Sequence, residues 1–268
     1  MQIPEYILSE EVPPIDQTRE AKMLSAFFGL DNALPPRSRL IWKGAPGKDG
    51  MPIVFSHEID PSTLDAADFQ VRTQKGEVLG IEHVSYRPAV EEFELRTLLL
   101  IGDYGNHPDN EPVEVEIVGD LNSRDGQNLK GQKITVTPLL DGPFLSYAEH
   151  FKIDEKYPYV ETGNGCDCPK AETEVVVRVV WAGGVRNKAG DELGEAEKQH
   201  FHVTVVNGQD TTVVNPYKIA DLDDNENNID LCLKATGVPI SVRVDANVAI
   251  DPNDDLNPET EVEIISRW

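Results

Sequence analysis

The chain has 268 residues, 39% of them hydrophobic, and carries 48 acidic against 24 basic side chains, which gives a formal net charge of −24. This length suits one large or two ordinary domains, and no apolar run reaches the roughly 18 residues that a membrane-spanning helix needs. A charge this negative disfavours binding to nucleic acid or to anionic membranes.

The excess of carboxylates has three explanations, and composition does not choose among them. The first is a solubilising surface, the second is the binding of divalent cations, and the third is a basic partner.

Short strands joined by turns are predicted along most of the chain, because its 20 glycines and 19 prolines are spread throughout. In residues 38–138 the predicted strands are Arg39–Trp42, Ile53–Phe55, Phe69–Thr73, Val78–Glu82, Glu94–Ile101, Val113–Ile117 and Lys133–Thr137. In residues 139–268 they are Pro143–Ala148, Glu174–Trp181, His200–Val206, Asp230–Lys234, Ile240–Val244 and Glu261–Ile265. Residues 1–37 are predicted to be a polar arm with a short amphipathic helix at 17–29. The predicted fold class is therefore all-β, with a short N-terminal helix before two β-sandwiches.

One stretch, Phe55–Val71, carries a family pattern. It reads FSHEIDPSTLDAADFQV, a strand ending in Phe-Ser, an acidic Asp-Pro turn and a new strand at Phe69. Gly-containing turns follow at residues 118–129 and 184–193. This pattern resembles bacterial Ig-like domains of the S-layer and adhesin type. The resemblance implies tandem Ig-like sandwiches that serve as spacer, binding or surface modules, and it implies no catalytic residues.

The first five residues, Met1–Glu5, have neither the basic region nor the apolar region of a signal peptide. We expect either a cytosolic protein or a sequence that begins at a mature N-terminus. The family resemblance implies the second, an exported protein of the periplasm or the cell surface.

Three cysteines bear on the same question. Cys166 and Cys168 lie in a predicted loop, and Cys232 lies in a predicted strand. In an exported protein we expect a disulfide from Cys232 to one of the pair, leaving one thiol. Free thiols and a zinc site are the alternatives, although zinc needs a fourth ligand and usually a wider Cys spacing.

A pair of histidines, His200 and His202, is the first candidate site. Residues two apart on a strand share a face, so both imidazoles could bind copper or zinc if a third ligand arrived from elsewhere. Glu197 and His150 are candidate third ligands. The alternative is two polar side chains on a solvated face.

An acidic loop is the second candidate site. Asp221, Asp223, Asn225, Asn227 and Asp230 supply alternating oxygen ligands of the kind that calcium prefers, although the loop departs from the EF-hand pattern. A plain acidic loop is the alternative. A similar stretch at 251–258 is explained by Asx turns with proline.

No motif for nucleophilic catalysis is present. Ser56 and His57 are expected to point to opposite faces of a strand and so to form no dyad, while a carboxylate pair of the glycosidase kind cannot be recognised among so many acids. The sequence predicts a non-enzymatic, exported or cell-surface binding or adhesion module with a protein or glycan ligand and calcium at its acidic loop. The alternatives are a copper- or zinc-binding protein and a carboxylate-based hydrolase.

Overall fold

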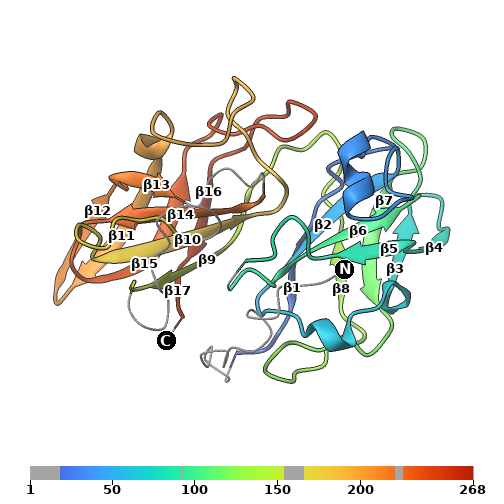
Figure 1. Ribbon diagram of the computed structural model, residues 1–268, viewed down its shortest axis with the longest axis horizontal. Helices are drawn as coiled ribbons and strands as arrows, with labels where there is room; N and C mark the ends of the chain where they lie inside the picture. Colours follow the sequence, from blue (N-terminus) through green and yellow to red (C-terminus); the bar gives the residue numbers. More distant parts are fainter. Residues whose placement is uncertain (1–18, 92, 154–165, 221–225, 268) are drawn as a thin grey trace. The chain divides into compact units, whose positions relative to one another are not determined.

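The computed structural model describes residues 19–91, 93–153, 166–220 and 226–267. Within these ranges the chain is all-β, as predicted, and it divides into two compact units, Met1–Asp141 and Gly142–Trp268 (Figure 1). In the described part, each unit contains two sheets that share a hydrophobic core. No helix of the described residues is long and apolar enough to cross a membrane.

The first unit is a sandwich of two antiparallel sheets, with strand orders β1-β2-β6-β5 and β4-β3-β7-β8. Phe55 and Leu98 of the first sheet and Val71 and Val115 of the second are buried in one core. The strands are β1 (Met23–Ala26), β2 (Asp49–Phe55), β3 (Phe69–Thr73), β4 (Val78–Gly80), β5 (His83–Ser85), β6 (Thr97–Gly102), β7 (Pro112–Ile117) and β8 (Lys133–Thr135).

The acidic turn after β2 begins a short 3-10 helix, η2 (Pro61–Thr63), followed by η3 (Ala66–Asp68). The Asp60 carboxylate accepts a hydrogen bond from the backbone N–H of Ser62 at 2.8 Å, and Pro61 occupies the first helical position, where it forfeits no hydrogen bond. The Asp-Pro turn seen in the sequence is therefore the capped start of a 3-10 helix.

The helix predicted at residues 17–29 is wrong in the described part of that segment. Met23–Ala26 form strand β1, which pairs with β2. Side-chain oxygens of Gln127 and Gln132 accept the backbone N–H groups of Ala21 and Met23 at 2.9 and 3.0 Å, so these donors are satisfied without a helix. The predicted strand Arg39–Trp42 is also wrong, because its first two residues belong to a 3-10 helix, η1 (Pro36–Leu40), and the other two lie in no strand.

The second unit has one sheet of order β13-β14-β10-β9-β17 and one of order β12-β11-β15-β16. Val177 and Val179 of the first sheet and Phe201, Val203 and Val242 of the second lie in the shared core. The strands are β9 (Leu145–Phe151), β10 (Val175–Trp181), β11 (Phe201–Asn207), β12 (Asp210–Val214), β13 (Lys218–Ala220), β14 (Asn228–Leu233), β15 (Val238–Val244), β16 (Thr260–Glu263) and β17 (Ile265–Ser266), with η4 (Lys198–His200) before β11.

A row of buried charges crosses the first of these sheets on the face away from the core. Arg178 on β10 is opposite Glu149 on β9 and Asp230 on β14, and all three are 0% exposed. The Arg178 guanidinium binds both oxygens of Asp230, with Nε–Oδ1 at 2.8 Å and Nη2–Oδ2 at 3.0 Å. Beyond β17, Arg267 pairs with Glu149, whose other oxygen accepts the Tyr147 hydroxyl at 3.0 Å. Every charge in the row therefore has a partner of opposite sign.

The predicted disulfide is present and joins Cys168 to Cys232, whose Cα atoms are 5.6 Å apart. Cys166 keeps a buried free thiol. Burial, followed by the nearby carboxylate of Asp230, raises the pKa of this thiol well above its usual value, which makes it a poor nucleophile at neutral pH. The disulfide removes Cys168 and Cys232 from any zinc site.

Replacing Asp230 by Asn should destabilise the second unit by about 3–5 kcal/mol, because Arg178 would keep a buried charge without its bidentate partner. Urea unfolding followed by the fluorescence of the buried Trp181 measures this change. The double variant Asp230→Leu with Arg178→Met should recover much of the loss. As a control, Glu114→Gln on β7 removes an exposed ion pair with Lys133 and should cost less than about 1 kcal/mol. Equal losses in Asp230→Asn and Glu114→Gln would contradict the role of the row.

Candidate functional site

Two histidines meet at one carboxylate beside the sheet β12-β11-β15-β16. His200 ends η4, His202 is the second residue of β11, and Asp245 directly follows β15. Phe201 and Val203 point into the core, so the alternation of the strand turns His202 to the outer face. The backbone N–H of Asp245 donates to the carbonyl of His200 at 3.1 Å and so fixes the two segments against each other.

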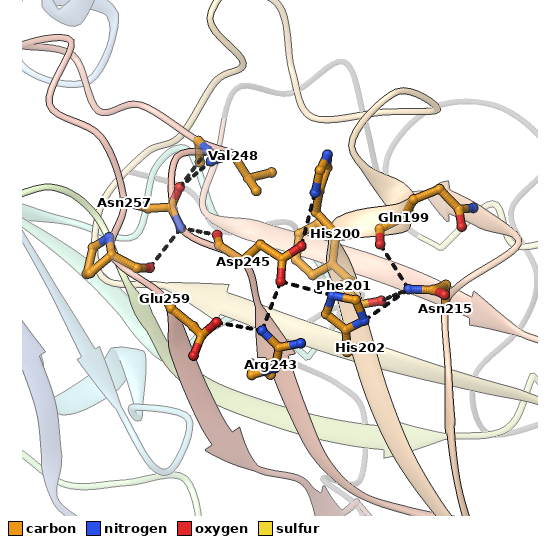
Figure 2. Close-up of polar contacts among 12 residues, drawn as sticks. Gln199, His200, Phe201, His202, Asn215, Arg243, Asp245, Val248, Asn257 and Glu259 are labelled. Atoms are coloured by element: carbon orange, nitrogen blue, oxygen red, sulfur yellow. Dashed lines mark hydrogen bonds and ion pairs between the residues drawn. The ribbon is translucent and has the colours of Figure 1, made fainter.

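The Asp245 carboxylate is the centre of the cluster, as Figure 2 shows. Its Oδ2 lies 3.1 Å from Nδ1 of His200, and its Oδ1 lies 3.0 Å from Nε2 of His202. The Arg243 guanidinium donates to the same Oδ1 at 2.8 Å and to Glu259 at 2.7 Å. Two imidazoles and one guanidinium thus share one acid.

The surrounding contacts set the tautomer of His202. The side-chain amide of Asn215 lies 3.3 Å from Nδ1 of His202 and donates to the carbonyl of Phe201 at 2.7 Å. The same nitrogen donates to the Gln199 carbonyl at 3.0 Å, so both of its hydrogens have carbonyl acceptors. The hydrogen on Nε2 follows instead from Asp245, because an ionised carboxylate can only accept. By contrast, His200 has a half-exposed side chain, and its Nε2 points away from Asp245 (Figure 2).

Asn257 holds the backbone that follows Asp245. Its side-chain nitrogen donates to the Asp245 carbonyl at 2.8 Å, and its oxygen accepts the N–H groups of Val248 and Ala249, both at 2.7 Å. These bonds fix the chain on the C-terminal side of the carboxylate, so the acid is held from both its backbone and its side chain.

Opposing effects act on the pKa of Asp245. Burial raises this pKa, but hydrogen bonds from His200, His202 and Arg243 outweigh burial and hold it below its usual value. The carboxylate therefore stays ionised throughout the neutral range, ready to receive a proton, a cation or a donor group.

The structure brings His200 and His202 together, although not as a single strand, because His200 still belongs to the 3-10 turn. Asp245 is the partner that the sequence analysis missed. It is separated from His202 by 43 residues, and only the pairing of β11 with β15 joins them. The other candidate ligands do not join the cluster: the Glu197 carboxylate accepts the Gly194 N–H at 2.8 Å, and His150 is on β9 of the other sheet.

In the described part of the chain, no group of three or more His, Cys, Asp or Glu side chains has the arrangement of a formed metal site. The two nitrogen–oxygen separations of 3.0 and 3.1 Å at Asp245 are a little shorter than the roughly 3.4 Å between two ligands on a tetrahedral zinc with bonds near 2.1 Å. A metal at this cluster would therefore require a small opening, and it would have to displace the Arg243 cation.

The predicted calcium loop lies only partly within the described residues. Asp221, Asp223 and Asn225 fall outside them. Asn227 is buried and donates to the Trp181 carbonyl at 2.7 Å, while Asp230 is held by Arg178. These two residues contribute to the packing of the second unit, and calcium binding by the loop stays a prediction.

The stretch at residues 251–258 folds as the sequence suggested. Oδ1 of Asp251 accepts the N–H groups of Asn253 and Asp255, both at 2.9 Å, as in an Asx turn.

The prediction that Ser56 and His57 point apart was wrong. Both follow the end of β2, so strand alternation does not apply, and the Ser56 hydroxyl lies 2.8 Å from Nδ1 of His57. Nε2 of His57 lies 3.9 Å from Oδ2 of Asp125. Ser56, His57 and Asp125 thus follow one another like the nucleophile, base and acid of a catalytic triad. However, the Ser56 oxygen also accepts the Lys22 N–H at 2.9 Å, and His57 is only 2% exposed. The group therefore fastens the segment before β1 and has no access to a substrate.

No protein-family model matches the chain, and no curated protein matches it. Among solved structures, domains 1–6 of the surface layer protein SbsC are similar with a TM-score of 0.31 and 9% identity, over 93% of this chain and 54% of that one. The crystal structure of the S-layer protein rSbsC(31-844) gives a TM-score of 0.31 and 9% identity, over 92% and 54%. The chain spans about half the length of these proteins, and a likeness of this size supports no conclusion about function.

The carboxyl pKa of Asp245, followed by carbon NMR, should lie below the usual value near 3.9 and should rise in His202→Ala, which removes one donor. Because the folded-state pKa is the lower one, the stability that Asp245 contributes is present above about pH 4 and is lost as the pH falls through the folded-state pKa. His107→Ala in the first unit is the control and should leave the titration of Asp245 unchanged. A normal pKa in the unsubstituted protein would contradict the assigned contacts.

Proposed function

We propose that the chain is a non-enzymatic, exported or cell-surface binding module. The observation that carries this proposal is the buried disulfide between Cys168 and Cys232. Disulfides form and persist in oxidising compartments and are rare in a reducing cytosol. Their loss typically costs about 2–5 kcal/mol, so the second unit depends on such a compartment.

The state of the buried acids favours a binding module over a carboxylate-based hydrolase. Asp230 and Glu149 are each held by an arginine. Asp49 accepts the backbone N–H groups of Asn32 and Tyr104 at 2.7 and 2.5 Å, and burial raises its pKa to about 6. Carboxylates with these partners stabilise the folded sandwich, whereas a glycosidase needs two carboxyl groups that face the sugar substrate.

The ligand we propose is a protein or glycan that contacts the loops between strands, since a rigid sandwich presents its loops for recognition. The charge of −24 makes nucleic acid an unfavourable partner. We propose in addition that calcium binds at Asp221, Asp223 and Asn225. The Phe55–Val71 motif supports the further proposal that the chain is related to Ig-like domains.

Trapping thiols in intact, acid-quenched cells tests the location. After denaturation without reductant, a polymer-linked maleimide should modify one cysteine per chain, Cys166, and after reduction it should modify all three. In the Cys166→Ser variant, no cysteine should react without reductant. If three react without reductant in the quenched cells, the protein lives in a reducing compartment and the proposal fails.

A second candidate function is the binding of copper or zinc, favoured by the convergence of His200 and His202 on Asp245. Two imidazoles and a carboxylate are a common ligand set for these metals. Arg243 opposes this function, because its positive charge lies 2.8 Å from one of the carboxylate oxygens.

Calorimetric titration of zinc and copper into the purified protein tests the second candidate. Arg243→Gln should tighten binding about tenfold, since it removes a cation that competes for Asp245. His202→Ala should abolish the binding, and His107→Ala should leave it unchanged. Equal affinities in the Arg243→Gln and unsubstituted proteins would exclude Asp245 as a ligand.

A further inference from the structure

Strand β12 (Asp210–Val214) is an edge strand whose outer side pairs with no other strand of the described residues. In the described part of the chain it pairs only with β11, at the outside of its sheet (Figure 1). It has five residues, whereas the other edge strands, β1, β4, β5, β8, β13, β16 and β17, have two to four. A long edge presents more unpaired backbone donors and acceptors to another chain.

Charge protects the edge of β16 more than that of β12. Edge strands commonly carry lysine or acidic side chains that discourage pairing. β16 carries Glu261 and Glu263 along its four residues, whereas the longer β12 reads DTTVV and carries a single charge, Asp210, at its first residue. In a chain with a net charge of −24, the four residues from Thr211 to Val214 form an uncharged stretch of edge.

Exposed apolar side chains lie on β12 and on β15 of the same sheet. Val213 is paired with Thr204 and is 64% exposed. On β15, Val238 and Ile240 are 53% and 42% exposed. β11 lies between these two strands and contributes Val206, which pairs with Val238. Exposed apolar side chains gathered in one sheet are typical of a surface that meets another protein.

The turn before β12 determines which backbone groups face outward. Asn207 pairs with Asp210 across a two-residue turn, in which Gly208 has a φ of +64°, as the first position of a type II′ turn requires. Hydrogen-bonded and non-hydrogen-bonded pairs then alternate away from the turn. Asp210, Thr212 and Val214 therefore bond to β11, and the N–H and C=O groups of Thr211 and Val213 point to the open side.

We propose that a second copy of this chain pairs antiparallel with β12 about a twofold axis at Thr212. In this register Thr211 is opposite Val213 of the second copy, and the reverse pair follows by symmetry. The outward N–H and C=O groups of both residues are satisfied, and the two four-stranded sheets become one continuous sheet. Asp210 is opposite Val214, so no like charges face each other.

The distribution of charge selects a second copy over a basic peptide. A basic strand would be drawn to β16, where Glu261 and Glu263 lie along the edge. Two chains of charge −24 approach most easily where charge is sparse, and the single charge of β12, Asp210, lies opposite the uncharged Val214 in this register. The edge β1 is also uncharged, but Gln127 and Gln132 already bind the backbone at its start. The proposal is independent of the location and of the metal chemistry proposed above.

Cysteine cross-linking of the full chain tests the axis directly. Thr212 would be about 4.5 Å from its copy between Cα atoms, as in a non-hydrogen-bonded pair, which is within the range of a disulfide. Under mild oxidation, Thr212→Cys should form a covalent dimer. Gln209→Cys, on the same hairpin but about 20 Å from its copy, should not. Cys166 is present in both variants and is buried, so it does not distinguish them.

Sedimentation equilibrium of chains without added cysteines gives a second measurement. The unsubstituted protein should form a reversible dimer, and Val213→Lys should weaken it about tenfold or more by placing like charges near the axis. Gln74→Lys adds the same charge to an exposed position of the first unit and should have no effect. Equal cross-linking at residues 209 and 212, or a dimer indifferent to Val213→Lys, would overturn the proposal, as would a protein that stays monomeric.

Discussion

The second unit depends on the row of buried charges formed by Arg267, Glu149, Arg178 and Asp230. Each charge is costly to bury alone and is tolerated only opposite its partner. Since successive residues of a strand point to opposite faces, a slip of one residue in β9, β10 or β14 would place a charge in the apolar core. The row therefore specifies the register of the sheet. Cys232 lies two residues after Asp230 on the same face, so that register also brings it to Cys168.

In the first unit, neutral side chains hold the β1 segment in register. Its β1 segment is held by the side chains of Ser56, Gln127 and Gln132, which accept backbone N–H groups from residues 21–23. Such contacts satisfy a short strand that pairs over few residues. His57 is buried beside them, and burial lowers its pKa, so the ring stays neutral near pH 7 and adds no charge to this attachment.

Strands with clear alternation, such as β7, β11 and β15, were predictable because each buries one face, and β10 was predictable from its run of valines although it is buried on both faces. The segment before β2 was not, since Ala21, Leu24, Phe27 and Phe28 fit a helical period, and the glutamines that satisfy its backbone lie more than a hundred residues away. The histidine pair was visible in the sequence, but Asp245 was not. Asp245 comes from a neighbouring strand, so its position beside the histidines depends on the register of strand pairing, which local sequence patterns do not encode.

The outer face of the sheet β12-β11-β15-β16 combines both features that we connect with binding. His202 and Arg243 form a polar cross-strand pair at one end of β11, and Val206 and Val238 form an apolar pair near the other. Pairing of β12 with its copy would extend this face across the twofold axis, with one histidine cluster on each side. Self-association through β12 and metal binding at the histidine cluster, the second candidate function, are thus compatible, because they involve different parts of one sheet.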